Sequence, residues 1–187
     1  MSAAPAAGGE IESVHVTRDG DRYLAAIRSS VDAPPAAVFE AMTDYANLTR
    51  LNPAVRESRI VAAYSENHHR VYTETLLCVL WYCATLRQTQ DMVGHPNDAL
   101  EAILIPDTGH FRQGHARWRF ETGAEGTTRL HFDSELEPAF WMPPVLDVWV
   151  LRHMLTREAT RTIEGLETVY RRQALDKTAP PGQPKNQ

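Results

Sequence analysis

The sequence predicts an α+β domain in which a curved antiparallel sheet wraps around one long helix. The first indication is the stretch from Pro144 to about Arg172, where apolar residues recur every three or four positions and charged residues fill the other face. The second is that most of the preceding chain alternates apolar and polar residues, in runs separated by turn residues, which is typical of strands. A helix about 40 Å long with one apolar face needs a surface of similar length to cover, and a sheet provides it.

Alternating runs predict the strands and leave room for two short helices. In chain order the runs are 11–17, 22–31, 57–64, 70–78, 84–93, 100–105, 115–121 and 129–137. The first two flank Asp19-Gly20, a strong hairpin signal. After the second run, Asp32 and Pro34-Pro35 start a short helix, and Asp44 starts another that ends before Pro53. The expected order is a strand hairpin, two short helices, about six further strands and the long helix.

Composition and charge fit a single domain that does not bind nucleic acid. The chain has 187 residues and a formal net charge of −5, with no Lys- or Arg-rich block. Its longest apolar run, 76–84, is far shorter than the roughly 20 residues of a membrane-spanning helix. We expect a disordered lead-in over residues 1–10, which lack the pattern of a signal peptide, a domain over 11–172 and a loose tail over 173–187.

The two cysteines, Cys78 and Cys83, are expected to be reduced thiols. Five residues apart, they would point to opposite faces of a continuous strand, so a disulfide requires that the chain turn between them. Because a secretion signal is not evident, we expect a cytoplasmic protein, at most peripheral on the inner membrane surface.

No standard catalytic, cofactor-binding or metal-binding motif occurs in the sequence. His-Glu-x-x-His, Gly-x-Ser-x-Gly and glycine-rich phosphate loops are missing, and so is a Rieske-type arrangement of Cys and His. Asp107, His110 and His115 lie in and beside one loop, but their spacing matches no standard metal site. We therefore expect no catalytic residue, no cofactor and no metal.

One segment carries a family resemblance. Val31 to Tyr45, read as strand, Pro-Pro, helix and Asp-Tyr, resembles the opening of the helix-grip proteins of the START-like superfamily, also called SRPBCC. Arg50-Leu51-Asn52-Pro53 stands where those proteins usually have a Trp-Pro-like break. The polyketide cyclase/dehydrase and coenzyme Q-binding branch is the most similar, and the resemblance covers roughly Tyr23 to Arg172. It implies a deep apolar cavity between sheet and long helix, open at one end of the helix.

The strand pattern predicts which side chains bind a ligand in this cavity. Gln88 and Gln90 share a strand face with apolar residues, and their amides would orient a ligand unless a bulge swaps the two faces. Tyr72 and Glu74 are further candidates of the same kind, although the sequence leaves the direction of their strand face ambiguous. The expected apolar walls are Trp118, Phe120, Phe132, Leu151 and Leu155.

Two apolar segments fall where loops are expected. They are Val79-Leu80-Trp81-Tyr82 and Phe140-Trp141-Met142-Pro143-Pro144. Both would lie around the cavity mouth in the helix-grip pattern, so Trp81 and Trp141 are candidate ligand contacts. Three interpretations stay open: plugs that seal the core, a gate for the ligand, or a weak and transient membrane contact.

The expected function is non-enzymatic binding or transport of a hydrophobic small molecule, such as a lipid, quinone or polyketide. One alternative is a cyclase or dehydratase acting on a polyketide-like chain, which would need an acid or base in the cavity. The other is a protein-interaction module like the ribosome-associated toxin branch of the superfamily. Fold resemblance alone does not choose between them, because the superfamily hosts several functions.

Overall fold

The computed structural model describes residues 8–79, 82–140 and 148–178, and shows one curved antiparallel sheet with a long helix across it. The strands are β1 (Ile11–Asp19), β2 (Arg22–Val31), β3 (Val55–Ser65), β4 (His68–Val79), β5 (Tyr82–His95), β6 (Ala99–Leu104), β7 (Phe111–Thr122) and β8 (Thr128–Pro138). The helices are α1 (Pro35–Thr43), the 3-10 turns η1 (Leu48–Arg50) and η2 (Ala124–Gly126), and α2 (Val148–Thr178).

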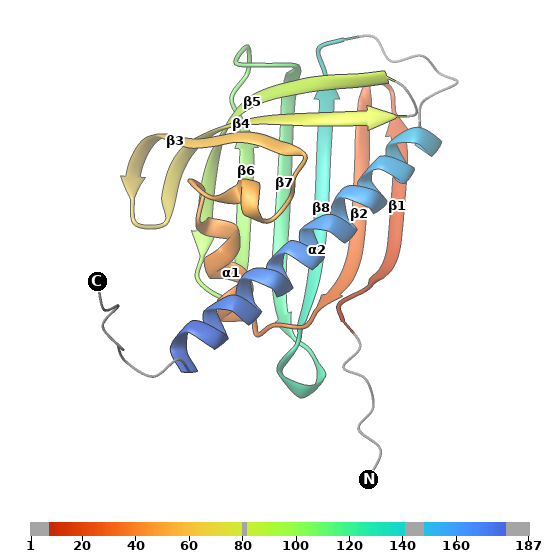
Figure 1. Ribbon diagram of the computed structural model, residues 1–187. Helices are drawn as coiled ribbons and strands as arrows, with labels where there is room; N and C mark the ends of the chain where they lie inside the picture. Colours follow the sequence, from red (N-terminus) through yellow and green to blue (C-terminus); the bar gives the residue numbers. More distant parts are fainter. Residues whose placement is uncertain (1–7, 80–81, 141–147, 179–187) are drawn as a thin grey trace, which may run out of the picture.

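The described strands form one eight-stranded sheet in the order β1-β2-β8-β7-β6-β5-β4-β3. The sheet curls so far that β4 and β5 arch over its concave side, and α2 crosses that side diagonally (Figure 1). The short elements α1 and η1 lie beside the C-terminal half of α2 (Figure 1). The predicted α+β class, a curved antiparallel sheet around one long helix, is confirmed.

The apolar stripe of α2 packs on two clusters of the concave face. Near its N-terminal end, Leu151, Leu155 and Ala159 contact the buried residues of β1 and β2. Further along, Ile163 and Leu166 are buried in a larger cluster that also includes residues of α1, β4, β5, β6 and β7. The apolar stripe of the helix therefore packs along the concave face from β1 to β4, as its period of three and four predicts.

Helix α2 extends past the predicted end at Arg172 to Thr178. The added residues include Gln173, Ala174 and Leu175, which favour helix, and Pro180 follows shortly after in the sequence. The start predicted at Pro144 lies outside the described residues.

Glu167, which the helical pattern assigns to the solvent face of α2, is buried with 6% of its surface exposed. Its carboxylate accepts hydrogen bonds from the backbone N–H groups of Gly9 and Asp32, the latter at 3.0 Å. The Arg171 guanidinium lies 3.3 Å away. A buried carboxylate is tolerated when it is paired in this way, and here it ties α2 to the segments before β1 and α1.

Cys78 and Cys83 form a disulfide, so the prediction of reduced thiols is wrong. That prediction assumed one continuous strand. The chain instead folds back between β4 and β5, and the two cysteines are directly opposite each other across the hairpin. Residues opposite each other on antiparallel strands point to the same face, which allows the sulfur atoms to bond.

Reducing this disulfide is expected to lower the free energy of unfolding by about 2 kcal/mol, because it closes a short loop in the unfolded chain. Thermal melts with and without a thiol reductant measure the effect. The control is the Cys78→Ser/Cys83→Ser variant, which should melt at one temperature under both conditions. Two free thiols titrated in the untreated, unfolded protein would contradict the bridge.

Candidate functional site

A cavity of about 310 Å³ lies on the concave side of the sheet, where α1, η1 and α2 approach strands β3 to β8. That volume is at the lower end of the range of small-molecule sites, roughly 300–1,000 Å³. Its apolar wall consists of Met42, Leu48, Leu51, Val55, Met92, Leu100, Ala102, Leu104, Ala116, Trp118, Phe132 and Leu136. The side chains that line the cavity are thus mostly apolar.

Neutral polar side chains interrupt this wall, and several of them come from one hairpin. The group consists of Asn52, Thr73, Thr75, Gln88, Gln90, Ser134 and Thr162. Thr73 and Gln88 are opposite each other on β4 and β5, and Gln88 Nε2 lies 3.5 Å from Gln90 Oε1. The structure therefore places both predicted glutamines on the cavity side of β5, without a swap of the strand faces.

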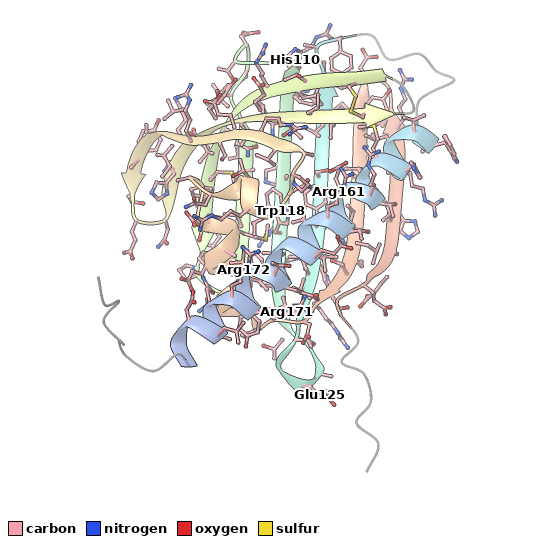
Figure 2. All side chains as sticks on the ribbon, viewed as in Figure 1. His110, Trp118, Glu125, Arg161, Arg171 and Arg172 are labelled. Atoms are coloured by element: carbon pink, nitrogen blue, oxygen red, sulfur yellow. A yellow bond between two sulfur atoms is a disulfide. The ribbon has the colours of Figure 1, made fainter. Side chains whose placement is uncertain are left out.

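Of the predicted aromatic residues, Trp118 and Phe132 line the cavity. Their ring centroids are 5.1 Å apart, and Trp118 lies near the middle of β7 (Figure 2). Phe120 is buried one step further along β7, where its ring meets Phe39 edge-on at 5.8 Å. Such tilted and edge-on pairs are favourable ring geometries and fix the shape of the wall.

Besides Phe120, four predicted residues are not among those that line the cavity. Leu151 and Leu155 pack against the cluster on β1 and β2. Tyr72 and Glu74 lie on the opposite face of β4 from Thr73, where the Arg59 guanidinium stacks 4.6 Å from the Tyr72 ring.

Glu74 forms an ion pair on that outer face. Its carboxylate accepts a hydrogen bond from Arg87 Nε at 2.7 Å, and this bond is the main cause of the raised pKa of Arg87. Glu74, expected as a ligand contact in the cavity, is thus engaged on the outer face instead.

Trp81 and Trp141 lie outside the described residues, so the gate, plug and membrane interpretations stay predictions. Within the described part of the chain, no helix is long and apolar enough to cross a membrane.

Among the residues described, no group of three or more His, Cys, Asp or Glu is arranged to hold a metal ion. His110 instead extends the sheet: its Nδ1 accepts the Arg87 backbone N–H at 3.0 Å, and its own N–H donates to the Arg87 carbonyl at 3.0 Å. This residue lies in the loop before β7, next to β5, in the view of Figure 2.

Asn52 is a lining residue that sequence reasoning missed. Its amide donates to the Glu158 carbonyl and to Thr162 Oγ1, both at 3.1 Å, and its Oδ1 accepts the Ala54 N–H at 2.8 Å. It therefore fastens the loop after η1 to the middle of α2, beside the cavity. The available signal was its place in the Arg50–Pro53 segment, where the resemblance expects a break.

Solved structures with the same fold are similar across nearly their whole length. An aromatase/cyclase from Streptomyces sp. R1128 superposes with a TM-score of 0.69 at 12% identity, covering 85% of this chain and 99% of that one. A START superfamily protein from Mycobacterium smegmatis gives 0.63 at 14% identity, covering 80% and 98%. A STAR-related lipid transfer protein from Xanthomonas axonopodis gives 0.61 at 12% identity, covering 84% and 98%. At these identities the likeness shows the fold, and the helix-grip fold that the resemblance implies is confirmed.

No curated protein matches the chain. A family model does, over residues 25–171, which is well over half of the sequence. The matched range begins in β2 and ends near the end of α2, so it includes every element that lines the cavity. The chain belongs to the family described as polyketide cyclase / dehydrase and lipid transport.

Proposed function

We propose that the protein binds a hydrophobic small molecule in the cavity and carries it without changing it chemically. The observation that carries this proposal is the cavity of about 310 Å³ with an apolar wall and a few neutral polar groups. Sites of this composition gain affinity from burying apolar ligand surface, at about 25 cal/mol per Å² before the costs of association, and orientation from the polar groups. The family and the similar structures support a hydrophobic-ligand-binding fold.

Native mass spectrometry of the freshly purified protein tests the proposal. We expect a lipophilic mass that stays bound in gentle conditions and leaves on denaturation. The Ala116→Leu variant, which adds volume inside the cavity, should lose that mass, whereas Ala26→Leu on the opposite face of the sheet should keep it. Equal retention by both variants would place the bound molecule elsewhere and contradict the proposal.

A cyclase is the second candidate, because several similar structures are aromatase/cyclases. Cyclisation of a poly-carbonyl chain needs groups that move protons. Among the described residues that line the cavity, His115 is the titratable one, and it is exposed on the outward alternation of β7. The neutral inward side chains favour binding over proton transfer.

Replacing Gln88 and Gln90 together by Leu is expected to preserve the fold and change which molecule is retained. Leu fills a similar volume but removes the hydrogen-bonding groups that line the cavity on β5. Native mass spectrometry should show a different or less abundant bound mass, with a melting temperature within a few degrees of the parent. Thr89→Val, between the two glutamines on the other strand face, is the control and should bind as the parent does. If the double variant retains the same mass in the same amount, the two glutamines do not determine which molecule binds.

A further inference from the structure

The hydroxyl of Thr73 is buried beside the cavity without a hydrogen-bond partner. Thr73 is 6% exposed and lines the cavity, and among the described residues no group bonds its Oγ1. Buried polar groups are almost always hydrogen-bonded, so an unpaired one needs an explanation. Rotation about χ1 moves the hydroxyl among three staggered positions, including the one that the methyl group occupies, which lets this hydroxyl face a molecule in the cavity.

Two more polar groups with free capacity adjoin Thr73. Gln88 is directly opposite it across the hairpin, and Gln90 follows on the same face of β5. The bond between the two amides is 3.5 Å long, at the outer limit for a hydrogen bond. A glutamine amide offers two donor hydrogens and an acceptor oxygen, so this one contact leaves most of their capacity for a ligand. We call Thr73, Gln88 and Gln90 the Thr73 cluster.

The side chains that line the cavity disfavour a charged ligand. The inward polar side chains of the described lining are hydroxyls and amides, while the ion pairs nearest the cluster, Arg87–Glu74 and Arg70–Asp91, belong to the other face of β4 and β5. A carboxylate or phosphate inside would lose its hydration without gaining a cationic partner, which is strongly unfavourable. A neutral hydroxyl or carbonyl meets no such penalty.

The volume limits the size of the ligand. About 310 Å³ corresponds to roughly ten groups the size of a water molecule or a methylene, at ~30 Å³ each. Two long acyl chains do not fit in that space, but a two-ring skeleton does.

We infer that the ligand is a compact, neutral, mostly apolar molecule with a hydroxyl or carbonyl group, and that this group hydrogen-bonds to the Thr73 cluster. The inference rests on the proposed function and adds the chemical class of the ligand. Thr73 is a specificity-determining residue in this account, because its hydroxyl has no other described partner to satisfy.

Three two-ring probes of the same skeleton test this class by calorimetry or fluorescence: naphthalene, 2-naphthol and 2-naphthoate. We expect 2-naphthol to bind about three- to tenfold more tightly than naphthalene, the usual gain from one neutral hydrogen bond. We expect 2-naphthoate to bind at least tenfold more weakly than 2-naphthol. Failure of all three to bind would overturn the proposed function and the inference with it. Equal binding of all three would leave the proposed function standing and overturn the inference alone.

The Thr73→Val variant keeps the shape of the side chain and removes the hydroxyl. It should lose most of the preference for 2-naphthol over naphthalene while binding naphthalene as well as the parent. Thr89→Val, on the outer face of the neighbouring strand, is the matched control and should keep the preference. If Thr73→Val is poorly folded, Thr73→Ser is measured instead, because it loses the methyl group and keeps the hydroxyl. It should keep the preference for 2-naphthol over naphthalene, which separates the effect of packing from that of the hydrogen bond. A preference unchanged in a folded Thr73→Val protein would overturn the role of Thr73.

Discussion

The Ile163→Asp variant is expected not to fold at ambient temperature. Ile163 is 3% exposed and belongs to the cluster that joins α2 to α1 and the sheet. An unpaired carboxylate at this position costs several kcal/mol, against a typical total stability of ~5–15 kcal/mol. Circular dichroism and a thermal melt give the result directly. Leu155→Asp should be milder, because Leu155 is only partly buried.

Thr160→Asp controls for placing an acid on this helix. Thr160 is exposed one turn before Ile163, so the same substitution there should shift the melting temperature by only a few degrees. If Ile163→Asp melts cooperatively at a temperature close to that of the parent, the apolar stripe of α2 is not part of the core. That result would contradict the packing of α2 on the sheet.

The Gly165→Ala variant is expected to lose about 1–3 kcal/mol of stability, as overpacked sites do. A Cβ atom at Gly165 would stand 2.0 Å from the Leu51 carbonyl oxygen and 2.6 Å from its carbonyl carbon. Both contacts are with backbone, so α2 or the loop after η1 must move. Helix propensity alone predicts the opposite sign, a gain of about 1 kcal/mol for Ala over Gly, so the direction of the change decides between the two effects.

The effect should extend to the ligand, because Leu51 and its neighbour Asn52 both line the cavity. Chemical denaturation of Gly165→Ala and of the exposed control Thr160→Ala measures the stability difference, and the naphthol titration measures binding. Stabilisation of Gly165→Ala by the full propensity gain would show that the close approach of α2 to Leu51 is absent.

The sequence predicted the elements with a repeating pattern and missed the features that depend on strand register and on contacts between distant segments. Period-two and period-three-to-four patterns are local, so the sheet, α1 and the stripe of α2 followed from them. The disulfide did not, because the loop expected at Val79–Tyr82 left the pairing register of the two flanking strands open, and that register places Cys78 opposite Cys83.

The register of the same hairpin decided the orientation of the candidate residues. Once Cys78 is opposite Cys83, Thr73 is opposite Gln88, so the inward glutamine makes Thr73 inward and sends Tyr72 and Glu74 outward. Burial of Glu167 was equally hidden. Its partners are the backbone N–H groups of Gly9 and Asp32, far away in sequence, and no side-chain pattern encodes them.

The most direct test of the central claim, that a hydrophobic molecule binds inside the cavity, is a titration of ¹⁵N-labelled protein with 2-naphthol followed by NMR. The account predicts saturable shifts of the Gln88 and Gln90 side-chain amides, the Thr73 backbone amide and the Trp118 indole, all from cavity-lining residues. Saturable shifts confined to outer-face groups, such as the side chains of Arg59 and Arg87, would contradict it.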